Sequence, residues 1–344
     1  MPHRKNTKTI LLIGPLPNKN STRIGGAKVS FAGFVTYLEE QNIAHQVINI
    51  DKYGRKHGTA LANLFYLVVN FVRHIFFVDL VMLNFSQRGS KIIAPFLYLI
   101  ARTCRTKIAF RIFGGEAKVI FQSLIWRVIW KSTILNSDVV FLQTKELLDY
   151  FKGHSKNLQW LPTSRKHVRK QLSDISFQRR FVFLGQVKIS KGILHIREAI
   201  EQLDSTYAIH IYGPIYEENL KFLAQKSYYK GFVEPSKVIE TLKDYDVLIL
   251  PTYYRGEGYP GVLIEAYSLG IPVITTNWRF IPEIVKDGET GILIEPKSTR
   301  SLVAAIQHFN AENYSTYSKK AFEYFNLFDA DVVNDKLIRT LNAL

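Results

Sequence analysis

Short apolar runs alternate with longer amphipathic stretches along the whole chain, and this alternation constrains the fold more than any other feature. Two parallel strands need a connection long enough to return over the sheet, and that connection is usually a helix. Continuous apolar runs are typical of strands that helices cover on both faces. The pattern therefore predicts an α/β protein with doubly wound parallel sheets.

The alternation occurs twice, with an interruption in the middle. The first series has five expected strands, TILLIG, HQVINI, VDLVMLNF, TKIAFRIF and SDVVFLQT. After the polar, basic stretch 162–178 it restarts, with expected strands RRFVFLG, YAIHIYG, YYKGFV, DVLILPT, IPVITT and GILIEP. A length of 344 residues suits two domains. We expect Rossmann-like domains at 1–165 and 166–325, and a C-terminal helix in 326–344 able to pack back on the first domain.

Open parallel sheets bind ligands beyond the carboxyl ends of their strands. Two such domains therefore predict a site in the cleft between them.

The cysteine count and the apolar runs indicate where such a chain works. Cys104 is the single cysteine, so no intramolecular disulfide can form. The apolar run near the N-terminus, 10–14, is too short for a signal-peptide core, and polar residues interrupt the most apolar region, 61–85. We expect a cytoplasmic protein with no membrane-spanning helix.

The net charge of +16 is concentrated in the first half of the chain. Residues 1–165 contain 23 Lys and Arg against 8 Asp and Glu, whereas residues 166–344 contain 22 against 21. Such asymmetry indicates an anionic partner: a membrane surface, a pyrophosphate-linked acceptor or nucleic acid. Alternatively, the charges only aid solubility. Basic and aromatic residues that suit a membrane surface, or else a core, are Tyr66, Phe71, Arg73, Phe76, Phe77, Trp126, Arg127, Trp130 and Lys131.

Chemistry is concentrated in the segment PTYYRGEGYPGVLIEAYSLGIPVI, residues 251–274. An expected strand ends at Pro251, and a helix is expected near Pro260, where proline is tolerated at the first helical position. The amides of Gly261, Val262 and Leu263 are then expected to lack intrahelical partners. Unpaired donors and the helix dipole both favour an anion, and a phosphate is the expected occupant.

Glu257 and Glu265 lie in this segment, one in the loop and one within the helix. Each oxygen of a carboxylate can accept from one hydroxyl, so the pair suits a sugar and a ribose. The spacing alone is a weak signal. The plain alternative is that Glu257 is a solvated loop residue and that Glu265 forms an ion pair on the helix surface.

The residues E-G-Y-P-G-V-L-I-E, followed by A-Y-S-L-G-I-P-V-I-T-T and I-P-E-I-V, resemble the donor-site signature of the retaining glycosyltransferases of family 4. FLGQVKISKGI, YAIHIYG, KGFV and DVLILPTYY follow the order of that family across 181–294. The resemblance implies the GT-B fold, with two Rossmann-like domains facing a cleft. It also implies that Glu257 contacts the donor sugar and Glu265 the nucleotide ribose.

The resemblance places further residues at the donor. Lys191, in ISKGI, would hold the diphosphate, and with Glu257 it forms the expected catalytic pair. The family usually has Arg where this chain has Gln186, so Lys188 or Arg255 is expected to substitute, or the leaving group is stabilised less. The remaining expected donor contacts are Gly258, Tyr259, Gly261, Val262, Gln186, Gly213, Phe232 and Val233.

The first domain is expected to supply the acceptor or phosphate loop. Gly25 and Gly26 precede a helix, where a helix-capping turn is the plain alternative. Arg111, Gly114 and Glu116 follow the fourth strand, and Glu116 is either an acceptor contact or a helix N-cap. The family often places a histidine here, but none occurs between His74 and His154.

The resemblance implies a transferase that retains anomeric configuration, uses neither metal nor cofactor, and stabilises the leaving group electrostatically. The expected partners are a nucleotide-sugar, probably of UDP, a glycan or polyprenyl-pyrophosphate-linked acceptor, and the anionic inner face of a bacterial membrane. The pathway would be surface polysaccharide synthesis. The alternatives are a sugar-nucleotide epimerase or phosphorylase, a degenerate transferase acting as a partner subunit, or a basic nucleic-acid-binding protein.

Overall fold

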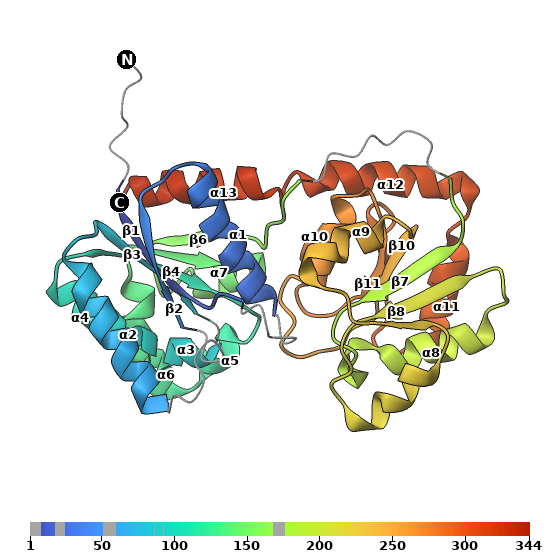
Figure 1. Ribbon diagram of the computed structural model, residues 1–344, viewed down its shortest axis with the longest axis horizontal. Helices are drawn as coiled ribbons and strands as arrows, with labels where there is room; N and C mark the ends of the chain where they lie inside the picture. The colour runs from blue at the N-terminus through green and yellow to red at the C-terminus, as the bar shows by residue number, and fades with distance from the viewer. Residues whose placement is uncertain (1–7, 18–24, 51–59, 86, 92, 168–175) are drawn as a thin grey trace, which may run out of the picture. The chain divides into compact units, whose positions relative to one another are not determined.

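The computed structural model describes residues 8–17, 25–50, 60–85, 87–91, 93–167 and 176–344. The chain divides into two compact units (Figure 1). Unit 1 comprises residues 1–163 and 330–344, and unit 2 comprises residues 164–329. The chain thus passes between the units at 163/164 and again at 329/330, close to the expected boundaries of 165/166 and 325/326.

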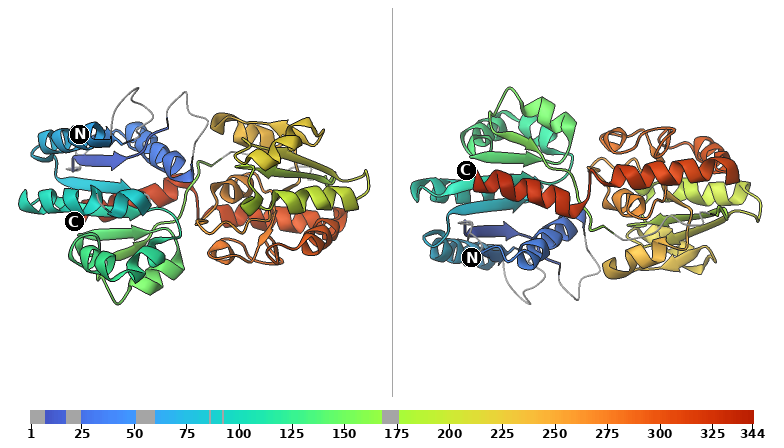
Figure 2. Two further views of the ribbon diagram at one scale, coloured as in Figure 1. Left: turned by 90° about the horizontal axis from the view of Figure 1, so that it is seen from below. Right: turned by 90° about the horizontal axis from the view of Figure 1, so that it is seen from above.

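Unit 1 is built on a parallel six-stranded sheet with the order β2-β1-β3-β4-β5-β6. Its strands are β1 Ile10–Gly14, β2 His45–Asn49, β3 Leu80–Phe85, β4 Lys107–Ile112, β5 Val139–Leu142 and β6 Leu158–Trp160. Its helices are α1 Gly26–Glu40, α2 Ala60–Ile75, α3 Gln87–Lys91, α4 Ile93–Thr103, α5 Ala117–Gln122, α6 Leu124–Ser132, η2 Ile134–Asn136, α7 Lys145–Phe151 and α13 Ala330–Asn342. The buried patterns of β1 and β3 reflect helices on both faces, as Figure 2 shows.

Unit 2 repeats the design, with the order β12-β11-β10-β7-β8-β9. Its strands are β7 Arg180–Leu184, β8 Ala208–Tyr212, β9 Tyr229–Gly231, β10 Val247–Leu250, β11 Val273–Thr276 and β12 Gly291–Ile294. Its helices are η3 Ile189–Lys191, α8 Ile193–Gln202, η4 Glu218–Gln225, η5 Pro235–Lys237, α9 Val238–Leu242, α10 Gly261–Tyr267, η6 Ile281–Glu283, α11 Thr299–His308 and α12 Ala311–Phe325. The predicted class of two doubly wound sheets is confirmed. The cleft between the units stays a prediction.

Local sequence explains where several helices begin and end. The side chain of Thr144 accepts from the Leu147 amide at the start of α7, and Asn310 and Asn313 form a capping box at the start of α12. The stretch 117–132 is apolar and helical in period, but Ser123 is extended and divides it into α5 and α6. The periodicity continues across Ser123, so it gave no sign of the break.

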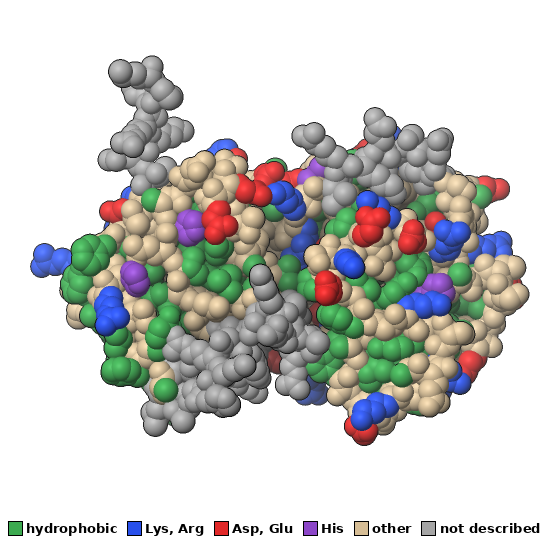
Figure 3. Space-filling view, viewed as in Figure 1, with side chains coloured by type: hydrophobic (Ala, Val, Ile, Leu, Met, Phe, Trp, Pro, Cys, Tyr) green, Lys and Arg blue, Asp and Glu red, His purple; other side chains and the backbone are tan. Residues whose placement is uncertain are grey.

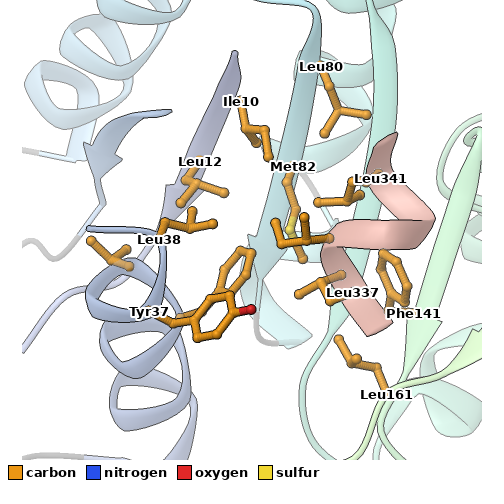
Figure 4. Close-up of a cluster of buried hydrophobic side chains, with 14 of the residues drawn as sticks. Ile10, Leu12, Tyr37, Leu38, Leu80, Met82, Phe141, Leu161, Leu337 and Leu341 are labelled. Atoms are coloured by element: carbon orange, nitrogen blue, oxygen red, sulfur yellow. The ribbon is translucent and has the colours of Figure 1, made fainter. Parts of the chain in front are cut away.

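The C-terminal helix α13 is part of the core of unit 1. Leu337 and Leu341 are buried in one cluster with Leu80, Met82 and Phe141, and Figure 4 shows the two leucines directed toward the sheet. The hydroxyl of Tyr37 on α1 hydrogen-bonds to Asp335 on α13. Burial of these side chains fixes α13 on unit 1 even though its sequence follows unit 2.

We expect Leu337→Ala to destabilise unit 1 by about 2–5 kcal/mol, because it deletes a fully buried side chain and leaves a cavity. Val332→Ala, on the same helix with 59% of the residue exposed, should change stability by no more than about 0.5 kcal/mol. Urea unfolding followed by circular dichroism measures both. Equal effects of the two substitutions would show that α13 does not pack as described.

Candidate nucleotide-sugar site

The candidate site of unit 2 lies where its strand order reverses. When the strands of unit 2 are numbered by their order in the chain, β7 is strand 1 and β10 is strand 4, and their order across the sheet is 3-2-1-4-5-6. The strand order therefore reverses between the neighbouring strands β7 and β10. In open α/β sheets ligands bind at such a reversal, outside the carboxyl ends of the strands. The loops after β7 and β10 carry Lys191 and Glu257, so the topology brings the two predicted catalytic residues together.

Backbone contacts hold these two loops against each other. The Tyr253 amide donates to the carbonyl of Ser190 at 2.8 Å. Gly192 has a φ of +80°, and a Cβ there would lie 2.2 Å from the carbonyl oxygen of Pro251. A glycine at 192 is therefore required both by the left-handed backbone and by the close approach of Pro251.

Lys191 and Glu257 form a largely buried ion pair. Lys191 Nζ lies 2.5 Å from Glu257 Oε2, and the Thr252 hydroxyl donates to the same oxygen at 2.8 Å. Glu257 is only 7% exposed, and Oε1 has no hydrogen bond among the residues that the structure describes. The pair is therefore preorganised, with one carboxylate oxygen left to accept from a ligand.

Aromatic rings surround the cations of this loop. Lys191 Nζ lies 5.2 Å from the centre of the Tyr254 ring, and Lys188 Nζ lies 4.6 Å from the Tyr216 ring and 5.9 Å from that of Tyr254. Burial lowers the pKa of Lys188, and the charge of Lys191 lowers it further, against the opposing effect of Glu217 and Glu257. Two lysines thus share one partly desolvated environment, which favours an anion.

The start of α10 differs from the sequence prediction in two ways. Pro260 is the residue before the helix rather than its first residue, and the helix begins at Gly261. The amide of Leu263 donates to the Pro260 carbonyl at 3.2 Å, so the expectation that it lacks a partner is wrong. Only Gly261 and Val262 occupy positions whose amides precede the first turn of hydrogen bonds.

Glu265 is paired with a residue that sequence analysis did not connect with the site. Arg165 Nε donates to Glu265 Oε1 at 2.5 Å, and a Cβ on Gly261 would lie 1.7 Å from Arg165 Nη2. Arg165 lies in the polar, basic stretch 162–178 that separates the two series of expected strands. No local pattern pointed to it, because its partner follows 100 positions later.

The other predicted donor residues lie around the same edge of the sheet. Gly213, after β8, has a φ of +137° and would meet the Gly185 carbonyl if it carried a Cβ. Tyr259 is buried, and its hydroxyl donates to Glu283 Oε2 at 2.5 Å, so it supports the loop from inside. Half-buried Gln186 follows β7, exposed Phe232 and half-buried Val233 follow β9, and half-buried Gly258 and Val262 flank Pro260.

The predicted residues of unit 1 occupy different environments. Gly25 precedes α1 and Gly26 begins it, and a Cβ at either would meet open space; residues 18–24 of that loop lie outside the described residues. Arg111 is buried within β4, with its guanidinium 4.6 Å from the centre of the Phe113 ring. Gly114 has a φ of +86° and donates to Gln143, and Glu116 stands at the N-cap of α5 without capping it through its side chain.

Within the described ranges, no three His, Cys, Asp or Glu side chains gather as a metal site would require. In the same ranges, no helix is long and apolar enough to cross a bilayer.

Two doubly wound units of this kind define the GT-B class of fold. The family model of glycosyl transferases group 1 matches residues 164–322, which lie within unit 2 and contain Lys191, Glu257 and Glu265. Unit 2 is thus similar to the glycosyl transferases group 1 family over nearly all of its length.

Two of the similar proteins have names that refer to bacterial polysaccharide synthesis. TuaC of Bacillus subtilis, a putative teichuronic acid biosynthesis glycosyltransferase, is 34% identical over 43% of this chain and 37% of its own length. WcaL of Escherichia coli, a putative colanic acid biosynthesis glycosyltransferase, is 31% identical over 47% of this chain and 45% of its own length. The match thus spans less than half the length of these relatives.

Solved structures resemble the chain over nearly its whole length. The crystal structure of HepE from Anabaena, in complex with UDP and glucose, has a TM-score of 0.74 and covers 98% of this chain and 100% of its own, at 17% identity. A glycosyltransferase from Rickettsia africae has a TM-score of 0.70, covers 97% of each chain and is 16% identical. These similarities establish the shared fold of both units.

We expect Gly192→Ala to destabilise unit 2 by more than about 2 kcal/mol, because a left-handed alanine costs about 1–2 kcal/mol before the Pro251 carbonyl is displaced. Gly288→Ala is the matched control: its φ is +72°, but its Cβ would meet nothing within 4 Å. That substitution should therefore cost only the backbone strain. Thermal unfolding of both variants measures the difference, and equal losses would contradict the packed contact between the two loops.

Proposed function

We propose that the chain is a retaining glycosyltransferase. It transfers a sugar from a nucleotide-sugar, most simply a UDP-sugar, to a glycan or lipid-linked glycan in bacterial surface polysaccharide synthesis. The observation that carries the proposal is the buried Lys191–Glu257 pair at the strand-order reversal of unit 2. The family of that unit and the names of TuaC and WcaL support it.

The geometry suits the two ends of a nucleotide-sugar. Lys191 has an ammonium that can neutralise a diphosphate, with Lys188 beside it. Glu257 keeps Oε1 for a sugar hydroxyl, while Thr252 and Lys191 hold Oε2. Glu265 would accept from the hydroxyls of the ribose. Each proposed contact uses an atom whose orientation the surrounding residues already restrict.

The proposed reaction relies on electrostatic stabilisation of the leaving group. The bond between the anomeric carbon and the diphosphate oxygen breaks, and the acceptor oxygen bonds to the anomeric carbon on the same face. The acceptor proton passes to the departing diphosphate. In this proposal Lys191 stabilises the negative charge that develops on that diphosphate, which is the kind of interaction that usually lowers a barrier most. We propose that this chemistry needs neither metal nor cofactor.

We expect UDP or a UDP-sugar at saturating concentration to raise the thermal midpoint of the purified protein by about 5 °C or more, since a ligand that binds only the folded state stabilises it. A panel of nucleotide-sugars identifies the donor. Glu265→Ala should remove most of the shift because it deletes the proposed ribose acceptor. Glu289→Ala is the control, since that side chain is half exposed in a weak surface pair with Lys320.

Product analysis separates this proposal from its rivals. A transferase yields a glycoside whose anomeric configuration matches the donor, whereas an epimerase yields a new nucleotide-sugar and a phosphorylase yields a sugar phosphate. Indifference of the wild-type protein to the whole panel would overturn the proposal.

We also propose that unit 1 attaches to an anionic membrane, the cytoplasmic face of which would present a polyprenyl-linked acceptor. Helices α2 and α4 pack together, and both carry exposed apolar side chains. These are Phe65 and Val72 on α2, Phe76 and Phe77 just after it, and Phe96 and Leu99 on α4. Exposed Arg73 and Arg105 accompany them, and Figure 3 shows hydrophobic and basic side chains together over these helices. Phe71 and Trp130, by contrast, are fully buried and belong to the core. An apolar face beside cations suits an anionic interface.

We expect the double substitution Phe76→Ser and Phe77→Ser to weaken cosedimentation with anionic phospholipid vesicles by on the order of tenfold, because it removes two inserted rings. The two residues are 70% and 75% exposed, so folding should be little affected. Phe222→Ser, at an exposed ring of unit 2, is the control. Failure of the wild-type protein to sediment with anionic vesicles would exclude this attachment.

A further inference from the structure

Arg165 is a cation of unit 2 that touches two proposed donor-binding residues. Its Nε donates to Glu265, and its Nη2 stands where a side chain on Gly261 would begin. The side chains of Arg165 and Glu265 are only 11% and 16% exposed. A carboxylate proposed to bind ribose is therefore already occupied, away from bulk water, by an arginine.

The backbone fixes the position of this arginine. The Arg165 amide donates to the carbonyl of Phe328 at 3.0 Å, and Arg165 and Asp329 form an isolated parallel bridge. At the other end, Nη1 donates to the carbonyl of Ser164 at 2.9 Å. Nη2, however, has no hydrogen bond within the described part of the chain. The guanidinium is thus held beside Gly261 with one nitrogen uncommitted.

We propose that Arg165 is the second cation of the donor site and that its pair with Glu265 is exchanged when a donor binds. This inference rests on the proposed function. The ribose hydroxyls would donate hydrogen bonds to Glu265, and the diphosphate would accept hydrogen bonds from the guanidinium of Arg165. Arg165 would thereby supply the charge that the family resemblance expects at position 186, where this chain has Gln186.

The exchange has a physical requirement that selects for an intact nucleoside diphosphate. Separating a buried ion pair is costly when either charge is left without a partner. A nucleoside offers hydroxyls to Glu265 but nothing to Arg165, whereas a nucleoside diphosphate offers partners to both. Guanidinium also matches phosphate oxygens with two parallel hydrogen bonds, which an ammonium does not. The pair therefore opposes ligands that satisfy only one of its members.

Two other cations were candidates for this role. Lys188 lies between the rings of Tyr216 and Tyr254, close to Lys191, and Arg255 is exposed in the loop after β10. In the contacts of the described residues neither reaches Glu265 or Gly261. Arg165 is the cation whose position is tied to both.

Calorimetric titration of the full chain with UDP and with uridine tests the exchange. We expect Arg165→Ala to weaken UDP binding about tenfold or more, since a charge-assisted phosphate contact is lost. The Arg165→Ala variant should bind uridine as tightly as the wild type or more tightly, because Glu265 no longer has to break an ion pair with Arg165. Arg165→Lys should fall between the wild type and Arg165→Ala for UDP. Adding Gln186→Arg to Arg165→Ala should recover much of the UDP affinity.

The result is decisive in either direction. Unchanged UDP affinity in both Arg165 variants, or parallel weakening of UDP and uridine, would overturn the inference and leave the proposed function standing. A selective loss of UDP affinity in Lys188→Ala but not in Arg165→Ala would assign the role to Lys188 instead. Absence of UDP binding by the wild-type protein would overturn the proposed function, and this inference with it.

Discussion

The hydrogen bond between the Tyr253 amide and the Ser190 carbonyl joins two loops that the sequence separates by some sixty residues. It can form because β7 and β10 are neighbours, which follows from the reversal of strand order in unit 2. Gly192 removes the side chain that would keep the loops apart. The contact holds together the loops that carry Lys191 and Glu257, so each of these largely buried charges has a partner.

Both carboxylates of the proposed donor site are paired with cations. Glu257 is held by Lys191, and Glu265 is held by Arg165. Each pair keeps its charges compensated in a partly desolvated setting. Among the residues that the structure describes, Oε1 of Glu257 and Nη2 of Arg165 have no hydrogen bond. A ligand that has both hydroxyls and a diphosphate can offer hydrogen-bond partners to the carboxylates and to the cations, so that no charge is left without a partner. The same ion pairs would therefore favour one chemical class of ligand.

The sequence predicted the two sheets well because fully covered strands leave continuous apolar runs. It missed β6, since Leu158–Trp160 is short, half-buried and at the edge of its sheet, where no apolar run is required. It predicted Lys191, Glu257 and Glu265 through local motifs. It could not predict Arg165, because only tertiary structure brings that residue to Glu265. It also did not predict the hydrogen bond of the Leu263 amide, which depends on the residue at which α10 begins. Local pattern thus located the loops, and long-range pairing decided what occupies them.

The uneven distribution of charge means that cations have different surroundings in the two units. Unit 2 is nearly neutral, and two of its cations at the proposed site, Lys191 and Arg165, are paired with carboxylates. Unit 1 contains few carboxylates, and its exposed Arg73 and Arg105 accompany exposed rings rather than acidic partners on α2 and α4. Such cations act at longer range and are screened by salt, so they suit attraction to an extended anionic surface. A compensated donor site and an uncompensated surface are consistent with one chain that binds a soluble nucleotide and works beside a membrane.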